Sequence, residues 1–348
     1  MKIKHTTHLL LILLLVFSQS VTAQEDNPVA YMDQVHTAEE EANQKYLLYI
    51  SAAAHSGRIR KIEKMRQQAI DGIVNSRTKV MSLPFYKGDN TLRKSSIDYL
   101  NFMYLIFTED YKKIVNMEEI AEQSFNEMQA YLLLQEQTSA KLTEASRKRN
   151  EATKEYAAKY NINLINQTSE QAEKQKKANE VIHYRNSLYL LFFKCNWQWG
   201  ELLKAIDNKK VNEIEQARIS VINYANEGIA GLDTLKSFDG DPTLANVCRH
   251  ALNQYKRMAE SDIPKATDFF LKEENFAKVK RSFESKPQGN RTQQDVDAYN
   301  KAVKEMNAGI NTFNSVLQQI NTNSAELTNN YNKADKEFAD KHTPYFKK

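Results

Sequence analysis

The chain is 348 residues long, and 41% of its residues are hydrophobic, while glycine and proline occur only nine and six times. This composition is typical of helical proteins and provides ample material for a core. The 48 basic and 44 acidic residues nearly balance. Because nucleic-acid-binding domains concentrate basic side chains on one face, this balance argues against a nucleic-acid partner.

The first 23 residues have the three-part pattern of a secretory signal. Lys2 and Lys4 precede nine consecutive apolar residues, 9–17, and the segment ends at Ala23. A membrane-anchoring helix is the alternative, but a span needs roughly 20 apolar residues. We therefore expect a signal peptide cleaved after about Ala23 and export to the periplasm or cell surface. No later segment has the composition of a transmembrane span, so none is expected in the mature chain.

Capping signals and apolar periodicity predict helices through the rest of the chain. Residues 168–171, Thr-Ser-Glu-Gln, have the pattern of a capping box, and Thr292 to Asp295 resemble a second helix start. The mature prolines before Pro344 fall at expected helix boundaries. The predicted helices are two within 31–82, followed by 90–113, 115–160, 168–206, 209–236, 241–272 and 292–342.

The sequence also resembles itself. Residues 85–92, FYKGDNTL, recur as 237–244, SFDGDPTL, at an offset of 152. Two further pairs of segments recur in the same order at unequal offsets, 46–50 with 189–193 and 154–159 with 336–341. A period this long indicates tandem domains rather than a solenoid. We expect an all-α fold of two tandem, unequal helical-bundle repeats with long antiparallel helices, namely a signal peptide (1–23), repeat 1 (24–166) and repeat 2 (167–348).

The recurring segment has the composition of a structural turn between helices. Gly88 and Gly240 supply backbone freedom at the end of one helix, and Asp89 and Asp241 are suited to cap the next. The aspartate of a Gly-Asp pair can also coordinate a cation. However, a calcium-binding loop needs several oxygen ligands, and this turn supplies a single carboxylate. We therefore interpret all four residues as structural.

The last predicted helix carries a heptad seam typical of a coiled coil. Its partner is expected within the same chain, although a helix of another chain is the alternative, and the sequence leaves the oligomeric state open. The seam consists of Val296, Tyr299, Val303, Met306, Ile310, Phe313, Leu317, Ile320, Ser324, Leu327, Tyr331, Ala334 and Phe338.

Residue types that carry metal or redox chemistry are sparse. The segments 180–183 and 33–36 each place a carboxylate three residues before a histidine, as in di-iron bundles, but they belong to different predicted copies. No metal or cofactor is therefore expected. Cys195 and Cys248 permit a disulfide in an oxidising compartment, with simple packing in the core as the alternative. Trp197 and Trp199 cannot both face one core, so one of them is a candidate exposed contact.

Four segments carry a resemblance to a known family, namely Ala54-His55-Ser56, Lys87-Gly88-Asp89, 110–122 and 267–271. They resemble segments of the leptospiral-type surface protein family, whose members are exported helical proteins of spirochaetes and Bacteroidetes-like bacteria. The resemblance covers most of residues 30–342. It implies exposure at the cell envelope and assigns no residue a role.

These observations together favour a non-enzymatic protein. We expect an exported envelope or surface protein that acts as a structural or interaction module through its helical faces, with a protein partner in the envelope. The alternative is a periplasmic carrier that holds an apolar small molecule in a bundle cavity. A metal-dependent bundle enzyme is a third hypothesis.

Overall fold

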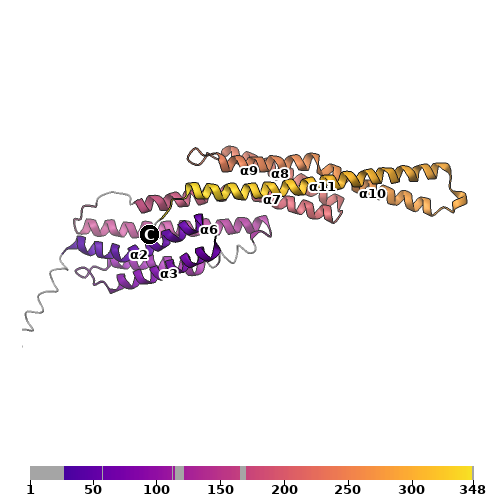
Figure 1. Ribbon diagram of the computed structural model, residues 1–348. Helices are drawn as coiled ribbons and strands as arrows, with labels where there is room; N and C mark the ends of the chain where they lie inside the picture. The colour runs from indigo at the N-terminus through magenta and orange to yellow at the C-terminus, as the bar shows by residue number, and fades with distance from the viewer. Residues whose placement is uncertain (1–26, 57, 112, 114–120, 165–169, 347–348) are drawn as a thin grey trace, which may run out of the picture. The chain divides into compact units, whose positions relative to one another are not determined.

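A computed structural model describes residues 27–346 except 57, 112, 114–120 and 165–169. The predicted signal peptide and the Thr-Ser part of the predicted capping box lie outside these residues. The described part is all-α and contains no β-strand (Figure 1). Its elements are α2 (Pro28–His55), α3 (Ile59–Ser82), α4 (Thr91–Leu105), the π-helix η1 (Ile106–Asp110), α6 (Phe125–Lys159), α7 (Glu170–Asp207), α8 (Val211–Thr234), α9 (Thr243–Ser261), α10 (Ile263–Glu284), the 3₁₀-helix η2 (Gln288–Asn290) and α11 (Gln293–His342).

Local capping chemistry explains where several helices begin. Asn27 accepts hydrogen bonds from the backbone N–H groups of Val29 and Ala30 at 3.0 and 3.1 Å, and Pro28 occupies the first helical position of α2. At the start of α11, Thr292 and Asp295 form a reciprocal capping box. Each accepts a hydrogen bond from the other's backbone N–H, at 3.2 and 2.9 Å.

One predicted helix is wrong as a single element, because residues 241–272 form two helices. Asp262 is both the C-cap of α9 and the N-cap of α10, and Pro264 lies in the first turn of α10. Proline lacks the backbone N–H that a continuous helix would need there, so the chain starts a new helix. The helix predicted over 115–160 is also wrong as a single element, because residues 122–124 are not helical and α6 begins only at Phe125.

The chain folds into two compact units. Unit 1 contains the described residues of Met1–Glu119, Tyr131–Asn179 and Thr343–Lys348, and unit 2 contains those of Ile120–Ala130 and Glu180–His342. This division differs from the boundary predicted near residue 166. Both α6 and α7 contribute to both units, and the last residues of the chain belong to unit 1.

In unit 1, α2, α3, α4 and α6 pack antiparallel as a bundle. The backbone N–H of Ala42 donates to Ser76 at 3.1 Å, which fixes α2 against α3, and Arg77 donates to Asn101 at 3.1 Å between α3 and α4. Buried tyrosine and aliphatic side chains fill the interior, and Phe107 in η1 is completely buried. The C-terminal residues also pack here: the ring of Tyr345 stacks on that of His55 with centroids 3.7 Å apart.

In unit 2, α7, α8, α9 and α11 surround a single core. α9 shows how sequence sets this arrangement, because its buried residues recur every three or four positions and so form one face. These residues are Leu244, Cys248, Ala251, Leu252, Tyr255, Met258 and Ala259.

The seam of α11 is packed within the same chain. Towards its C-terminal end it contributes to the core of unit 2, where the ring of Tyr331 stacks on that of Phe192 at 4.0 Å. Towards its N-terminal end it pairs with α10 as a hairpin (orange in Figure 1), and Gly309 lies close to the ring of Phe269. Residues 271–301 of this hairpin contain no buried side chain.

No helix in the described part of the chain combines the length and the apolar character that crossing a membrane requires.

Candidate functional site

The sequence-predicted turn residues lie in two tight turns of the same type. In unit 1 the turn has positive φ at Lys87 (48°) and Gly88 (81°), and in unit 2 at Asp239 (51°) and Gly240 (77°). Positive φ at both central residues defines a type I′ turn. In each, an aspartate N–H donates to the carbonyl of an aromatic residue, at 2.7 Å for Asp89 and 2.8 Å for Asp241.

In unit 1 the turn positions the Asp89 carboxylate between two helices. One oxygen accepts from the backbone N–H of Thr91 at 2.8 Å, in the first turn of α4. The other oxygen accepts from the Lys159 ammonium at 2.7 Å and from the Tyr160 hydroxyl at 3.0 Å, at the C-terminal end of α6. Asp89 thus caps one helix and holds the end of another.

Unit 2 repeats this arrangement with one change of residue. Asp241 accepts from the backbone N–H of Thr243 at 2.9 Å, and its other oxygen binds Lys341 at 2.7 Å and His342 Nε2 at 2.8 Å. These residues end α11, so a histidine stands where unit 1 has Tyr160. We call the two arrangements the Asp89 clasp (Asp89, Thr91, Lys159, Tyr160) and the Asp241 clasp (Asp241, Thr243, Lys341, His342).

An aromatic cluster lies beneath each clasp. In unit 1 it contains Tyr31, Tyr86, Tyr156 and Tyr160, with ring centroids 4.7–6.0 Å apart in the contacting pairs. In unit 2 it contains Tyr184, Phe238, Phe338 and His342, with centroids 4.4–5.7 Å apart. Each cluster joins the first helix, the turn and the last helix of its unit, so the clasps close the ends of the bundles.

The clasps hold both carboxylates in their ionised form. For Asp89, burial opposes ionisation, but hydrogen bonds from Lys159 and Thr91 outweigh it and keep the pKa well below its ordinary value. For Asp241, the hydrogen bond from Lys341 is the largest influence, followed by those from Thr243 and His342, and the pKa is likewise well below its ordinary value. The carboxylates therefore act as permanent anions that anchor helix ends.

We expect these lowered pKa values to make the stability of the protein depend on pH in the acid range. Below about pH 4 the unfolded carboxyls take up protons while the native ones remain ionised, so the clasps lose stabilising effect as pH falls further. In the variant Asp89→Asn/Asp241→Asn, the melting temperature at pH 7 should be lower, but its decrease between about pH 7 and pH 3 should be smaller than in the wild type. The control is Asp98→Asn, in an exposed pair with Lys94. An unchanged pH dependence in the double variant would contradict the assignment.

The turn glycines allow a second prediction. Gly88→Val and Gly240→Val should each lower the free energy of unfolding by about 1 kcal/mol or more, because a β-branched residue is strained at positive φ. A Cβ at either position meets no atom within 4 Å, so the cost is conformational rather than steric. Gly200→Ala, in helical backbone with equally open surroundings, is the control and should be neutral or stabilising. Urea unfolding measures all three.

The cysteines do not form the disulfide that the sequence left open. Cys195 and Cys248 are free and completely buried. The Cys195 thiol lies 3.8 Å from the carbonyl oxygen of Val221, and the Cys248 thiol lies 3.7 Å from that of Leu188. Burial raises the pKa of both thiols, to about 12 for Cys248. Each therefore packs as a small apolar side chain with a weak hydrogen bond.

The tryptophans divide as their spacing predicts. Trp199 is buried in the core, whereas Trp197 is half-buried and its indole N–H donates to the carbonyl of Gln123 at 3.1 Å. Trp197 thus fixes residues of the 120–130 segment within unit 2.

The described residues contain no group of three or more metal-ligating side chains that could hold an ion. His36, one of the histidines in the carboxylate-histidine pattern, is half-buried, and burial together with the nearby Arg149 guanidinium lowers its pKa. These surroundings disfavour a second positive charge.

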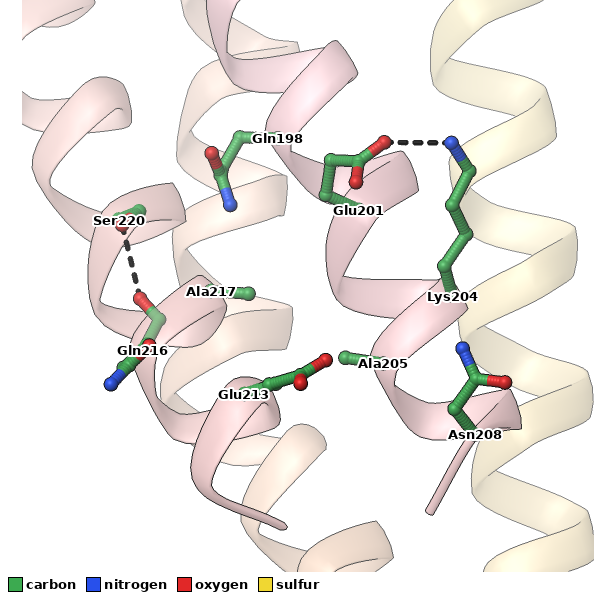
Figure 2. Close-up of a pocket in the computed structure, with 9 residues that line it drawn as sticks. All are labelled: Gln198, Glu201, Lys204, Ala205, Asn208, Glu213, Gln216, Ala217 and Ser220. Atoms are coloured by element: carbon green, nitrogen blue, oxygen red, sulfur yellow. Dashed lines mark hydrogen bonds and ion pairs between the residues drawn. The ribbon is translucent and has the colours of Figure 1, made fainter. Parts of the chain in front are cut away.

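A groove of about 430 Å³ lies on unit 2 between the end of α7 and the start of α8 (Figure 2). Its lining is largely polar, and one of its members, Glu201, is paired with Lys204 at 2.7 Å. The lining residues are Gln198, Glu201, Lys204, Ala205, Asn208, Glu213, Gln216, Ala217 and Ser220. This open, polar groove is unlike the apolar cavity that a carrier of apolar molecules requires.

Sequence reasoning missed two ion pairs between the first and last helices of the units. Glu39 is 1% exposed and pairs with Arg149 of α6, whose Nε donates at 3.2 Å. In unit 2, Arg185 donates to Asp335 of α11 at 2.7 Å. The partners are 110 and 150 residues apart in sequence, so no local pattern reveals them.

Comparison of the chain with models of known protein families, with curated proteins and with solved structures finds no match.

Proposed function

We propose that the chain is a tandem duplication in which α2, α3, α4 and α6 correspond to α7, α8, α9 and α11. The two clasps support this, because they use the same turn, carboxylate and lysine at matched places. One further ion pair recurs at the offset of 152. Glu63 binds Arg66 as Glu215 binds Arg218, each three residues apart.

The first helices match at an offset of 153. Tyr31 and Tyr184 each belong to the aromatic cluster of their unit, and Asn43 and Asn196 each accept a hydrogen bond from a tyrosine hydroxyl. The likeness of 46–50 to 189–193, at an offset of 143, therefore does not align equivalent positions. In this register Tyr46 corresponds to the buried Trp199.

The two copies differ most in the α10–α11 hairpin. The offset rises from 152 at the turn to 182 at the last helix, so the second copy carries 30 additional residues between these points. These additional residues are divided between the two helices of the hairpin. At a rise of about 1.5 Å per residue, they lengthen the hairpin by roughly 20 Å. Residues 271–301, which lack buried side chains, lie in this part.

We infer that the protein is an exported envelope protein that acts as a non-enzymatic interaction module, as the resemblance to leptospiral-type surface proteins implies. The hairpin is the observation that carries this function. It is a two-helix projection whose residues 271–301 bury no side chain in a core, and the stacked rings of Phe283 and Tyr299, 4.6 Å apart, hold this distal part together. A projection maintained in this way is suited to contact another protein.

Site-specific crosslinking in cells tests this function. A photoreactive residue at Lys280 or Gln288 on the hairpin should yield a discrete adduct with an envelope protein. The same residue at Lys204, also exposed but on the bundle of unit 2, is the matched control and should not. If the hairpin positions yield no adduct while the protein is folded and exported, the interaction role of the hairpin is wrong.

A further inference from the structure

The bundle end that carries the Asp89 clasp has exposed apolar side chains. Val29, Met81 and Phe85 are 43%, 53% and 52% exposed. The Arg93 side chain joins two of them, because it donates to the carbonyl of Met81 at 2.6 Å and its guanidinium lies 5.0 Å from the centre of the Phe85 ring. Tyr31, two residues after Val29, donates to the carbonyl of Pro84 at 2.8 Å, which places the start of α2 at the same end.

Basic side chains accompany this apolar surface. Residues 81–98 contain three basic residues, Lys87, Arg93 and Lys94, and two acidic residues, Asp89 and Asp98. Asp89 pairs with Lys159 within the clasp and Asp98 pairs with Lys94 at 3.3 Å, so Lys87 and Arg93 carry the net positive charge of this surface. The end of unit 1 thus combines a net positive charge with exposed aromatic and aliphatic groups.

The matched segment of unit 2 lacks both features. Residues 233–250 contain two basic residues and three acidic ones, of which Asp241 pairs with Lys341 and Asp233 with Arg249. Asp233 and Ser237 occupy the positions of Met81 and Phe85, and Asp239 occupies that of Lys87. The turn and its clasp are the same in both units, so the fold does not require the apolar and basic residues of unit 1.

We propose that this surface, formed by Val29, Met81, Phe85, Lys87 and Arg93, docks on an anionic lipid bilayer. Exposed apolar side chains flanked by lysine and arginine are the combination that inserts between headgroups while the cations bind lipid phosphates. The proposal rests on the envelope location in the proposed function and adds a second contact, separate from the hairpin. Unit 1 would then attach to a membrane surface through this end of its bundle.

Vesicle co-sedimentation tests this docking. Protein beginning at Gln24 is used, so that the apolar N-terminal segment does not contribute. It should sediment with vesicles containing phosphatidylglycerol and much less with phosphatidylcholine alone. Met81→Asp/Phe85→Ser, which installs the residues of unit 2, should weaken binding at least about five-fold.

The matched control is Ile219→Ser/Leu271→Ser, which removes two similarly exposed apolar side chains from unit 2 and should leave binding unchanged. Circular dichroism and thermal unfolding establish that both variants are folded. The docking is overturned if the wild type does not sediment with the anionic vesicles, or if both double variants bind as the wild type does. Equal binding to both vesicle types would refute recognition of anionic headgroups. The crosslinking result from the hairpin does not depend on any of these outcomes. Each proposal can therefore be refuted independently of the other.

Discussion

Glu39→Gln is expected to lower the free energy of unfolding by about 3 kcal/mol, the largest effect of a single polar substitution that we predict. The Glu39 carboxylate is buried against Arg149, so its removal leaves a guanidinium without its anion in a largely dry interior. His36, whose pKa is lowered by burial and by Arg149, lies close to the same pair. Urea unfolding measures the loss, and a change below about 0.5 kcal/mol would show that the pair is solvated.

Unit 2 supplies a matched control for this substitution. At the offsets given above, Glu39 and Arg149 correspond to Phe192 and Tyr331, whose rings stack 4.0 Å apart at an interplanar angle of 4°. We therefore expect Glu39→Phe/Arg149→Tyr to recover most of the stability that Glu39→Gln loses, because well-packed apolar groups often replace buried ion pairs without cost. Failure of the double variant to fold would contradict the proposed equivalence of these positions.

Tyr331→Ala is the second prediction with a large expected effect. Its ring is completely buried in unit 2 and stacks on Phe192, so truncation should cost about 3–5 kcal/mol. Tyr331→Phe, in contrast, should not lower the free energy of unfolding. The Tyr331 hydroxyl has no hydrogen-bond partner among the described residues, so removing it relieves an unsatisfied polar group.

Comparing the two Tyr331 variants separates packing from polarity. Thermal and urea unfolding should show Tyr331→Phe to be at least as stable as the wild type. If Tyr331→Phe loses more than about 1 kcal/mol, the hydroxyl must make a hydrogen bond in solution. If Tyr331→Ala is nearly neutral, the stacked pair does not form the centre of this core.

The helical class could be predicted from the sequence because its signals are local. The predicted start of the last helix is one residue from the observed start at Gln293, since Thr292 and Asp295 carry the complete capping box. The break at Asp262 was missed although Pro264 marks it, because the apolar spacing continues across the break. Periodicity alone therefore overestimated the length of that helix.

The candidate site could be predicted only in part. The Gly-Asp turns are recognisable because all their residues are contiguous, but Lys159 and Lys341 lie 70 and 100 residues from the carboxylates they bind. Nothing in the local sequence pairs them. The repeated Lys-Glu-aromatic-Ala segment drew attention to these lysines without indicating their role. Buried ion pairs such as Glu39 with Arg149 depend on the tertiary fold and have no sequence pattern.

The C-terminal residues have a consequence for how the protein completes folding as it is synthesised. Unit 1 begins with α2, yet the Phe346 backbone N–H donates to Ser51 of that helix at 3.4 Å, and the Tyr345 ring stacks on His55. Residues 345–346 thus pack on a helix that is synthesised almost 300 residues earlier, since Ser51 and Phe346 are 295 positions apart. If the chain crosses a membrane from its N-terminus, this part of the unit 1 bundle remains incomplete until Phe346 has crossed. Such an order favours delivery of an unfolded chain and delays the final closure of unit 1.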